Sequence, residues 1–220
     1  MRDSNADSFA RLLHGVRRFR REVYPNRSDV YREAAQNPQR PHTLIITCAD
    51  SRIDPELITQ AEPGDIFVTR NIGNLVPAYG EMLGGVSAVI EYAVGALDVS
   101  HIVICGHTDC GAMKAMLDPG SVAKLPTVRA WLRNAEAALS IVRSKSADET
   151  PTLEELIEEN VLQQMIHLRT HPSVAGKLAR RELTLHGWVY DIGEGDIRMH
   201  DPELERFVRI EQVVGDLTSL

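Results

Sequence analysis

Two short apolar runs with β-strand character each end directly before a motif of metal-ligating side chains. The run 44–47 precedes Cys-Ala-Asp-Ser-Arg at 48–52, and the run 102–106 precedes His-Thr-Asp-Cys at 107–110. The motifs together supply two cysteines and one histidine, which are ligand types that zinc prefers. Structural zinc sites usually have four protein ligands, whereas catalytic sites keep one coordination position open. Three protein ligands therefore indicate a catalytic zinc site instead of a structural one.

The middle of the chain alternates expected strands with expected helices. Strands are predicted at 44–47, 66–70 and 101–105, and helices at 86–97 and 111–117. This alternation predicts an α/β fold in which helices flank a central, mostly parallel β-sheet. Ligands bind outside the carboxyl ends of the strands in such sheets, and both motifs fall at such ends. The positions of the two motifs in the predicted sheet therefore agree with a role in metal binding.

The N-terminal segment is predicted to be a helical arm. Apolar residues recur at helical spacing over 8–23, and a second, short helix is expected at 28–36. The second helix should end at Asn37-Pro38, because the residue before a proline avoids the helical region. The arginine-rich face of the first helix resembles a transit peptide, but its acidic residues are out of keeping with one. A docking helix is the favoured interpretation.

Two helices and a hairpin are predicted for the C-terminal half. One helix is expected at 128–143, followed by a polar link at 144–150. The next helix should begin at Pro151 and be broken at His171-Pro172. Residues 188–191 and 197–199, separated by a glycine-rich turn, are predicted to form a hairpin at the edge of the sheet.

The length and composition predict one domain. A chain of 220 residues with 43% hydrophobic content can bury one full core. The domain is expected to span 1–220, with the helical arm at 1–37 and the α/β core and C-terminal part at 38–220. The net charge of -7 argues against nucleic acid as a partner, because nonspecific phosphate binding needs a basic face.

Membrane insertion and export are not expected from the sequence. The chain has no run of about 18 apolar residues, and its N-terminus lacks the apolar stretch of a secretory signal. Three cysteines are an odd number, which suits thiolate ligands better than a disulfide framework. A cytoplasmic location in a reducing compartment is therefore predicted.

Cys48, His107 and Cys110 are the predicted ligands of one zinc ion per chain. His107 and Cys110 are close together at the start of an expected helix, whereas Cys48 comes from the end of another strand. Each residue alone would suit a purely structural role, with the cysteines buried and the histidine hydrogen-bonded in a loop. The combination makes that alternative improbable. Cys105 lies inside an apolar run and is predicted to belong to the core.

Asp50 and Arg52 are the second informative pair of residues. A carboxylate two residues after a ligand can coordinate zinc itself and close the site. Alternatively, Arg52 can hold Asp50 bidentately, so that Asp50 orients a zinc-bound hydroxide as an outer-shell group. A plain surface salt bridge is the third possibility. The neighbouring metal ligand favours a functional role for the pair.

The motifs C-x-D-x-R and H-x-x-C between parallel strands resemble those of the β-class carbonic anhydrases, in particular a bacterial-type chain of the plant-like subgroup. The resemblance extends through 63–74 and 88–93, more weakly through 187–191, and covers roughly 8–210. It implies reversible hydration of carbon dioxide to bicarbonate and a proton by zinc-bound hydroxide. It also implies a homodimer, or a higher homo-oligomer built of dimers, in which the N-terminal helices wrap the partner and the active sites lie at the subunit interface.

The resemblance also assigns residues by their position. It matches Cys48, His107 and Cys110 to the zinc ligands. Asp50 and Arg52 match the catalytic pair. Gln39 matches a glutamine that donates a hydrogen bond to bound substrate. Phe67, Ile72 and Tyr92 match three residues of the pocket wall.

One residue departs from an allosterically regulated subgroup of the same family. That subgroup carries tryptophan three residues before the first cysteine ligand, where this chain has Ile45. The difference argues against the additional bicarbonate site of that subgroup and against its tendency to rest with the Asp50 carboxylate on zinc.

Two other functions remain open at this level. A carbon disulfide or carbonyl sulfide hydrolase can use the same fold and the same zinc-bound hydroxide. A non-catalytic zinc-binding shell or scaffold protein would instead keep Asp50 as a permanent fourth ligand. For the favoured carbonic anhydrase, two thiolates cancel the charge of the ion, so the bound water should be less acidified than in an all-histidine site.

Overall fold

A computed structural model describes residues 5–81, 84–145 and 150–214 of the chain. The contacts divide the chain into two compact units. The first comprises Met1–Gln39 together with Glu62–Gly64, and the second comprises Arg40–Ala61 and Asp65–Leu220.

The first unit is helical. Helix α1 spans Asn5–Arg18 and continues as a π-helical turn at Phe19–Val23, a 3-10 turn at Tyr24–Arg27 and helix α2 at Ser28–Gln36. The predicted bounds of α2 are therefore confirmed, whereas regular α-helix ends at Arg18 instead of continuing to residue 23. In the π turn, the Tyr24 N–H donates to the Phe19 carbonyl, and the rings of Phe19, Tyr24 and Tyr31 pack together.

The apolar side chains of α1 and the π turn are exposed. Six of them have exposed fractions between 40% and 64%: Phe9, Leu12, Leu13, Val16, Phe19 and Val23. The docking role predicted for this face remains a prediction.

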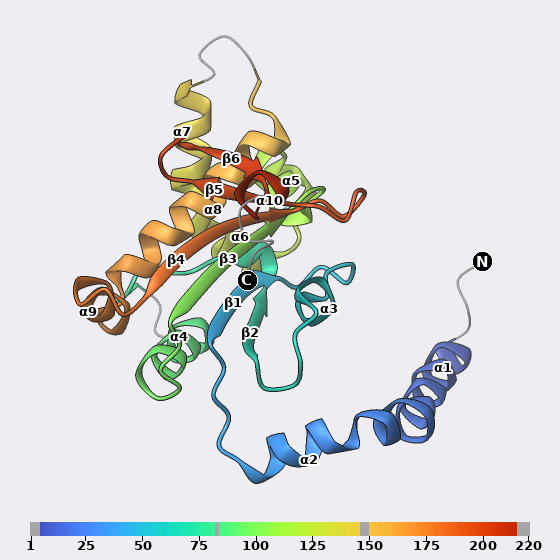
Figure 1. Ribbon diagram of the computed structural model, residues 1–220. Helices are drawn as coiled ribbons and strands as arrows, with labels where there is room; N and C mark the ends of the chain where they lie inside the picture. The colour runs from blue at the N-terminus through green and yellow to red at the C-terminus, as the bar shows by residue number, and fades with distance from the viewer. Residues whose placement is uncertain (1–4, 82–83, 146–149, 215–220) are drawn as a thin grey trace. The chain divides into compact units, whose positions relative to one another are not determined.

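The second unit is built on a six-stranded sheet in the order β2-β1-β3-β4-β5-β6 (Figure 1). The first four strands in this order are parallel, and β5 and β6 join them in antiparallel pairing. The strands are β1 at Thr43–Cys48, β2 at Ile66–Asn71, β3 at His101–His107, β4 at Thr184–Tyr190, β5 at Ile197–Asp201 and β6 at Arg206–Arg209. The predicted mostly parallel α/β fold and the β4–β5 hairpin are therefore confirmed. Strand β6 was not predicted, because its four residues are too few to show a periodic pattern.

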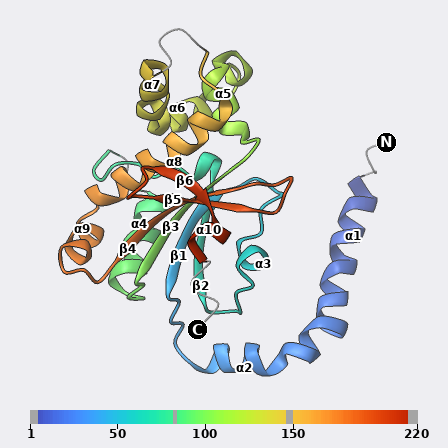
Figure 2. The same ribbon diagram turned by 45° about the horizontal axis from the view of Figure 1, so that its top comes forward.

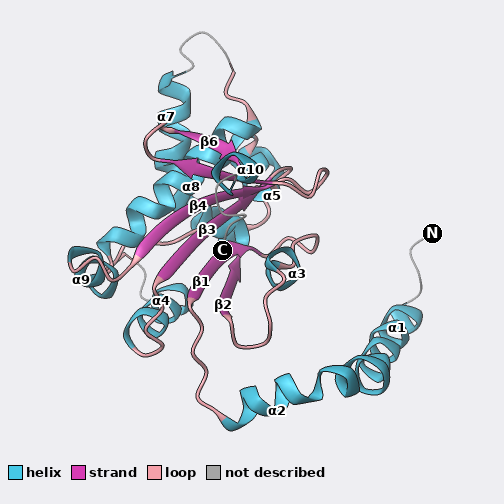
Figure 3. Ribbon diagram, viewed as in Figure 1, coloured by secondary structure: helices cyan, strands magenta, loops and turns pink. Residues whose placement is uncertain are grey.

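Helices flank this sheet, as the colouring by secondary structure in Figure 3 shows. Helix α8 packs against β3 and β4, and α4 packs against β2 and α9. Helices α5, α6 and α7 lie together near one end of α8 (Figure 2). The helices of this unit are α3 at Pro55–Thr59, α4 at Gly85–Gly95, α5 at Gly111–Leu117, α6 at Pro126–Leu132, α7 at Glu136–Lys145, α8 at Leu153–Thr170, α9 at Pro172–Ala179 and α10 at Ile210–Val214.

The structure corrects one helix prediction. The single helix expected at 128–143 is two helices, α6 and α7, joined by a 3-10 turn at Arg133–Ala135. At this break the Asn134 side chain donates to the Trp131 carbonyl at 2.8 Å. Side-chain donors of this kind compete with the backbone for helix carbonyls.

Helix α8 begins at Leu153, two residues after the predicted start at Pro151, and it ends before His171-Pro172 as predicted. Thr152 and Glu155 form a capping box at the start of α8, and His171 ends the helix before Pro172. The short helices α3 and α9 were not predicted. Of the polar link expected at 144–150, the first two residues belong to α7, and 146–149 lie outside the described residues.

Both faces of the central strands are buried. The main core lies between the sheet and the helices and includes Leu44, Ile104 and Val161, each with an exposed fraction of 0%. A second, smaller core cluster contains Ile45, Val103 and Cys105. The prediction that Cys105 belongs to the core is confirmed, because its exposed fraction is 6%. Packing on both faces therefore fixes the positions of the carboxyl ends of strands β1 and β3.

Candidate metal centre

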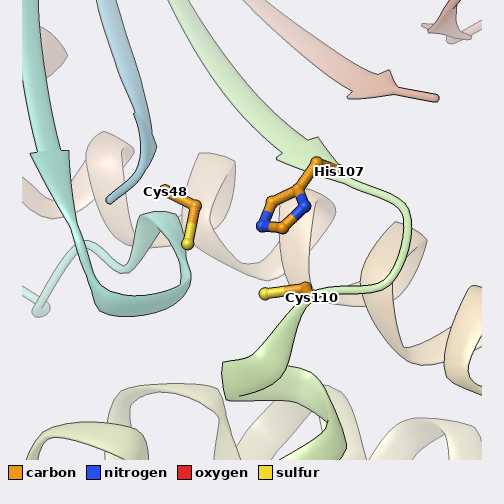
Figure 4. A group of neighbouring side chains, drawn as sticks. All are labelled: Cys48, His107 and Cys110. Carbon is orange, nitrogen blue, oxygen red and sulfur yellow. The ribbon is translucent and has the colours of Figure 1, made fainter. Parts of the chain in front are cut away.

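The three predicted metal ligands meet at the carboxyl ends of two adjacent strands. Cys48 is the last residue of β1, His107 is the last residue of β3, and Cys110 directly precedes α5. Their ligand atoms all lie within 4.8 Å of one another, and the side chains point toward a common centre (Figure 4). All three residues are buried, with exposed fractions of 5%, 0% and 1% respectively.

The hydrogen bonding of His107 leaves one ring nitrogen for a metal. Its Nδ1 lies 2.8 Å from the Thr108 carbonyl oxygen, which can only accept, so Nδ1 carries the proton. In the neutral imidazole Nε2 then has a free lone pair, and this nitrogen is buried and without a hydrogen-bond partner. A buried nitrogen without a partner is unfavourable unless another ligand, such as a metal ion, contacts it.

The two nearby thiols suit the same ion. The thiol of Cys110 and the side chain of His107 lower the pKa of Cys48 to about 4, and the Gly73 N–H, 3.4 Å from the Cys48 sulfur, adds to the effect. The pKa of Cys110 is raised, because the pair shares one proton and is buried. In contrast, burial raises the pKa of the Cys105 thiol to about 12. Two sulfur donors and one nitrogen donor fit a zinc ion.

A buried polar network holds the loop that contacts Cys48. Gly73 has a φ of +81°, and a side-chain carbon at this position would lie 2.9 Å from the Cβ of Ala112. Its carbonyl accepts a hydrogen bond from the Asn160 amide at 3.2 Å, and Asn160 in turn accepts one from Gln164 at 3.0 Å. Gln164 also accepts the Val76 N–H at 2.8 Å. Sequence reasoning missed this network, whose signal is two polar residues spaced four apart on the buried face of α8.

Asp50 and Arg52 form a bidentate ion pair beside the ligand cluster. Arg52 Nε lies 2.9 Å from Asp50 Oδ1, and Nη2 lies 2.8 Å from Oδ2. The backbone N–H of Arg52 also donates a hydrogen bond to Asp50 Oδ1 at 3.0 Å. These hydrogen bonds hold the pKa of the Asp50 carboxyl well below its usual range. Asp50 is not a member of the cluster of potential metal ligands, which consists of Cys48, His107 and Cys110.

Arg70 supports the same turn from strand β2. Its Nε donates to the Cys48 carbonyl at 3.1 Å, and its Nη2 donates to the Asp50 carbonyl at 2.6 Å. The guanidinium therefore fixes the backbone between the ligand and the carboxylate. The sequence showed Arg70 as part of the family motif but gave no reason to assign it this role.

Asp109 provides a second partner for Arg52. Arg52 Nη1 lies 2.9 Å from Asp109 Oδ2, and the ammonium group of Lys114 contacts the other oxygen of Asp109. Asp109 has a left-handed backbone with a φ of +62°. Since this residue lies between His107 and Cys110, it joins the loop of one motif to the arginine of the other. Its side chain was also missed, although it stands inside the H-x-x-C motif.

The residues predicted to line the substrate pocket are only partly brought together. The rings of Phe67 and Tyr92 have centroids 6.1 Å apart. Tyr92 is 50% exposed and Ile72 is 44% exposed, and the Ile72 carbonyl accepts the Trp131 indole N–H at 2.8 Å. Gln39 is exposed and belongs to the first compact unit. The roles predicted for these four residues stay predictions.

Comparisons with known proteins agree with this fold and this cluster. The family model described as carbonic anhydrase matches residues 43–197, and the chain belongs to the carbonic anhydrase family. A carbonic anhydrase of Pseudomonas aeruginosa is 48% identical over 202 residues, which cover 91% of each chain. The solved β-carbonic anhydrase CcaA is 40% identical, with a TM-score of 0.88 over 92% of each chain. A tetrameric β-carbonic anhydrase of Sordaria macrospora is 30% identical, with a TM-score of 0.76 over 88% of this chain and 96% of that one.

The chain is therefore an enzyme, a lyase that reversibly hydrates carbon dioxide to bicarbonate and a proton. The sulfur-substrate and scaffold alternatives are not favoured by these relatives. The β-class enzymes are metalloenzymes, and the Cys-His-Cys cluster is a place where this chain can hold the metal. No helix among the described residues is long and apolar enough to cross a membrane.

Proposed function

We propose that Cys48, His107 and Cys110 hold one zinc ion per chain and that carbon dioxide is hydrated at this centre. The observation that carries the proposal is the buried, unpaired Nε2 of His107 next to two thiols, because this donor set matches zinc. When bound, zinc supplies a Lewis acid that makes water nucleophilic near neutral pH. The three protein ligands leave room for that water.

Arg52 and Asp50 position the reacting water in this proposal. The bidentate pair holds Asp50 as a carboxylate and keeps it from closing the metal centre. Asp50 Oδ2 accepts one hydrogen bond from Arg52 and has a second lone pair, which accepts a hydrogen bond from the attacking water. Asp109 and Arg70 fix this pair from two sides.

Four further residues are proposed to bind the substrate. Carbon dioxide is apolar and has no hydrogen-bond donor, so side chains of Phe67, Ile72 and Tyr92 suit it as a wall. The amide of Gln39 donates a hydrogen bond to the oxygen that becomes negative during hydration. The Phe67–Tyr92 ring contact supports the wall.

A homodimer, or a higher homo-oligomer built of dimers, is proposed as the active form. Six apolar side chains of the arm are between 40% and 64% exposed, and burying them requires a partner surface. The tetrameric relative from Sordaria macrospora supports assembly. We propose one domain with the arm at 1–37 and the rest at 38–220, and a cytoplasmic location, which the three free thiols suit.

The metal assignment is tested by stopped-flow hydration of carbon dioxide between about pH 6.5 and 9 on protein of measured zinc content, a range chosen to bracket the pKa of a zinc-activated water. We expect a rate proportional to zinc content that rises with pH. Protein free of zinc that hydrates carbon dioxide at the full rate would contradict the proposal.

The assembly is tested by deleting residues 1–24. We expect the dimer to dissociate at concentrations where the full chain remains dimeric, as measured by light scattering. Leu12→Ser with Val16→Ser should act in the same direction, whereas Arg11→Ser with Arg17→Ser, which leaves the apolar face intact, should not. A truncated protein that remains dimeric and fully active at those concentrations would exclude the arm from assembly.

A further inference from the structure

A pair of histidines lies on the sheet at the end remote from the metal centre. His101 is the first residue of β3, and His186 lies on the adjacent parallel strand β4, where it is in register with Val103. His186 Nε2 lies 3.2 Å from His101 Nδ1. The ring centroids are 5.3 Å apart, and the ring planes are inclined at 51°. Two ring nitrogens therefore face each other across the strands.

We propose that His101 and His186 form a second, exchangeable binding site for a divalent transition-metal ion such as zinc or copper. A tetrahedral zinc ion with bonds of about 2.0–2.1 Å requires its two nitrogens to lie roughly 3.3–3.4 Å apart. The observed 3.2 Å is close to this value, so a small rotation of the exposed His101 ring suffices to admit an ion. The ion replaces the proton that one ring shares with the other. Neutral imidazoles bind zinc, copper and nickel in preference to magnesium or calcium.

The surroundings of the pair keep the site open to water. Both rings line a cavity of 550 Å³, whose other titratable residues are His42 and Asp65. His42 already contacts Thr43 Oγ1 through Nδ1 at 2.7 Å. Burial and the nearby His101 lower the pKa of His186, which favours the neutral form that binds metals. Among the described residues, a group of three close ligand atoms occurs at Cys48, His107 and Cys110 and not here. Two protein ligands and water therefore give a weaker, exchangeable site.

The histidine pair is separate from the catalytic centre. His101 begins β3 and His107 ends it, so the two sites are roughly 20 Å apart at about 3.3 Å per residue. They share no ligand, and this inference does not depend on the function proposed for the first site. An ion at the pair joins β3 to β4 and binds the folded chain more tightly than the unfolded one, in which the two rings are not held together. It should therefore raise the melting temperature.

Zinc titration of the tag-free protein, already carrying one zinc per chain, tests the second site. We expect calorimetry at pH 7.5 to show one additional equivalent of zinc. His101→Asn and His186→Asn should each weaken this second binding by at least about tenfold, because a single histidine remains. The exposed His14, replaced in His14→Asn, serves as the control and should leave the second equivalent unchanged.

Thermal unfolding gives an independent readout. Excess zinc should raise the melting temperature of the starting protein but not that of His186→Asn, while both retain the first zinc and the hydration rate. Absence of a second equivalent in the starting protein would overturn the proposal. Second binding of unchanged affinity in both histidine variants would overturn it as well, since the ion would then lie elsewhere. His101→Asn, at an exposed position, keeps the test valid if His186→Asn does not fold.

Discussion

Strand β3 carries a histidine at each end, and the two lie in opposite surroundings. His107, at the carboxyl end, is fully buried, and the Thr108 carbonyl fixes its Nδ1. His101, at the other end, is exposed, and its Nδ1 faces the ring of His186. The same residue type thus belongs to a buried ligand cluster at one end of the strand and to a pair of neighbouring histidines at the other.

The two ends differ in their ligands, three protein side chains against two, and also in the residues that support them. Near His107, the Gly73 N–H contacts the Cys48 sulfur, Asn160 holds the Gly73 carbonyl, and Arg52 holds Asp50. Around His101, the coordination must be completed by water. Outer-shell contacts of this kind usually decide how tightly a metal is held. We therefore expect a resident metal at the carboxyl end and an exchangeable one at the other.

Loss of a thiolate should have the largest effect. Cys48→Ser and Cys110→Ser each remove a charged ligand, so we expect loss of zinc and a fall of the hydration rate to background. Cys105→Ser is the matched control and should keep most of both, because its thiol is outside the cluster. Elemental analysis and stopped-flow rates measure both outcomes. Full zinc content in both Cys48→Ser and Cys110→Ser would show that these cysteines do not hold the resident metal, and the contrast between the two ends of β3 would then fail.

Arg52→Ala should reduce the hydration rate by about 10–100-fold while zinc content stays near one per chain, because outer-shell partners typically have effects of this size. Without Arg52, the Asp50 carboxylate is free to coordinate the metal. Asp50→Asn should also be slow, but a neutral amide is a poorer zinc ligand and should not close the site in the same way.

Arg180→Ala is the control for Arg52→Ala. Arg180 pairs with Glu182 two residues away at the surface, as Arg52 pairs with Asp50, but at a place without metal ligands. We expect its hydration rate to stay within about twofold of the starting protein, as for other exposed ion pairs. Equal rates for the two arginine variants would make the Asp50–Arg52 pair an ordinary salt bridge.

Gln164→Leu tests the buried support beneath the Gly73 loop. The change leaves the Val76 N–H without its partner, so the free energy of unfolding should fall by about 1–3 kcal/mol. Gln163→Leu, next to it on α8, loses a part-buried hydrogen bond to Glu159 and should cost less. Urea unfolding compares the two variants. A smaller loss for Gln164→Leu than for Gln163→Leu would mean that the network does not hold the loop.

The histidine pair should give the smallest effect, and it depends on pH. The pKa of His186 is lowered in the folded chain, so the unfolded chain takes up its proton first as pH falls. The stability that the neutral pair contributes to the folded chain is fully present above the ordinary histidine pKa near 6.5, and it is lost as pH falls below that value. In the metal-free protein, His186→Asn should therefore reduce the drop in melting temperature between about pH 7.5 and 5.5, by no more than roughly 2–4 °C. Identical drops in both proteins would show that the pair does not titrate in this range.

The sequence predicted the parts of this molecule that depend on local patterns. Apolar runs gave β1 and β3, and the ligand motifs fell at their carboxyl ends because parallel strands place those ends together. The helix break near Asn134 was not predictable, because it depends on side-chain hydrogen bonds instead of on periodicity. Asn160, Asp109 and Arg70 were missed for a similar reason. Each acts through a contact with a residue far away in the sequence.

X-ray absorption at the zinc edge tests the central claim most directly. The measurement uses the full chain loaded with one zinc per chain, so that the stronger site alone is filled. We predict two sulfur neighbours at about 2.3 Å, one nitrogen at about 2.0–2.1 Å and one oxygen at about 2.0–2.2 Å, as for two cysteines, one histidine and one water. A zinc shell made only of nitrogen and oxygen, or one with a single sulfur, would contradict the assignment of Cys48 and Cys110 as ligands.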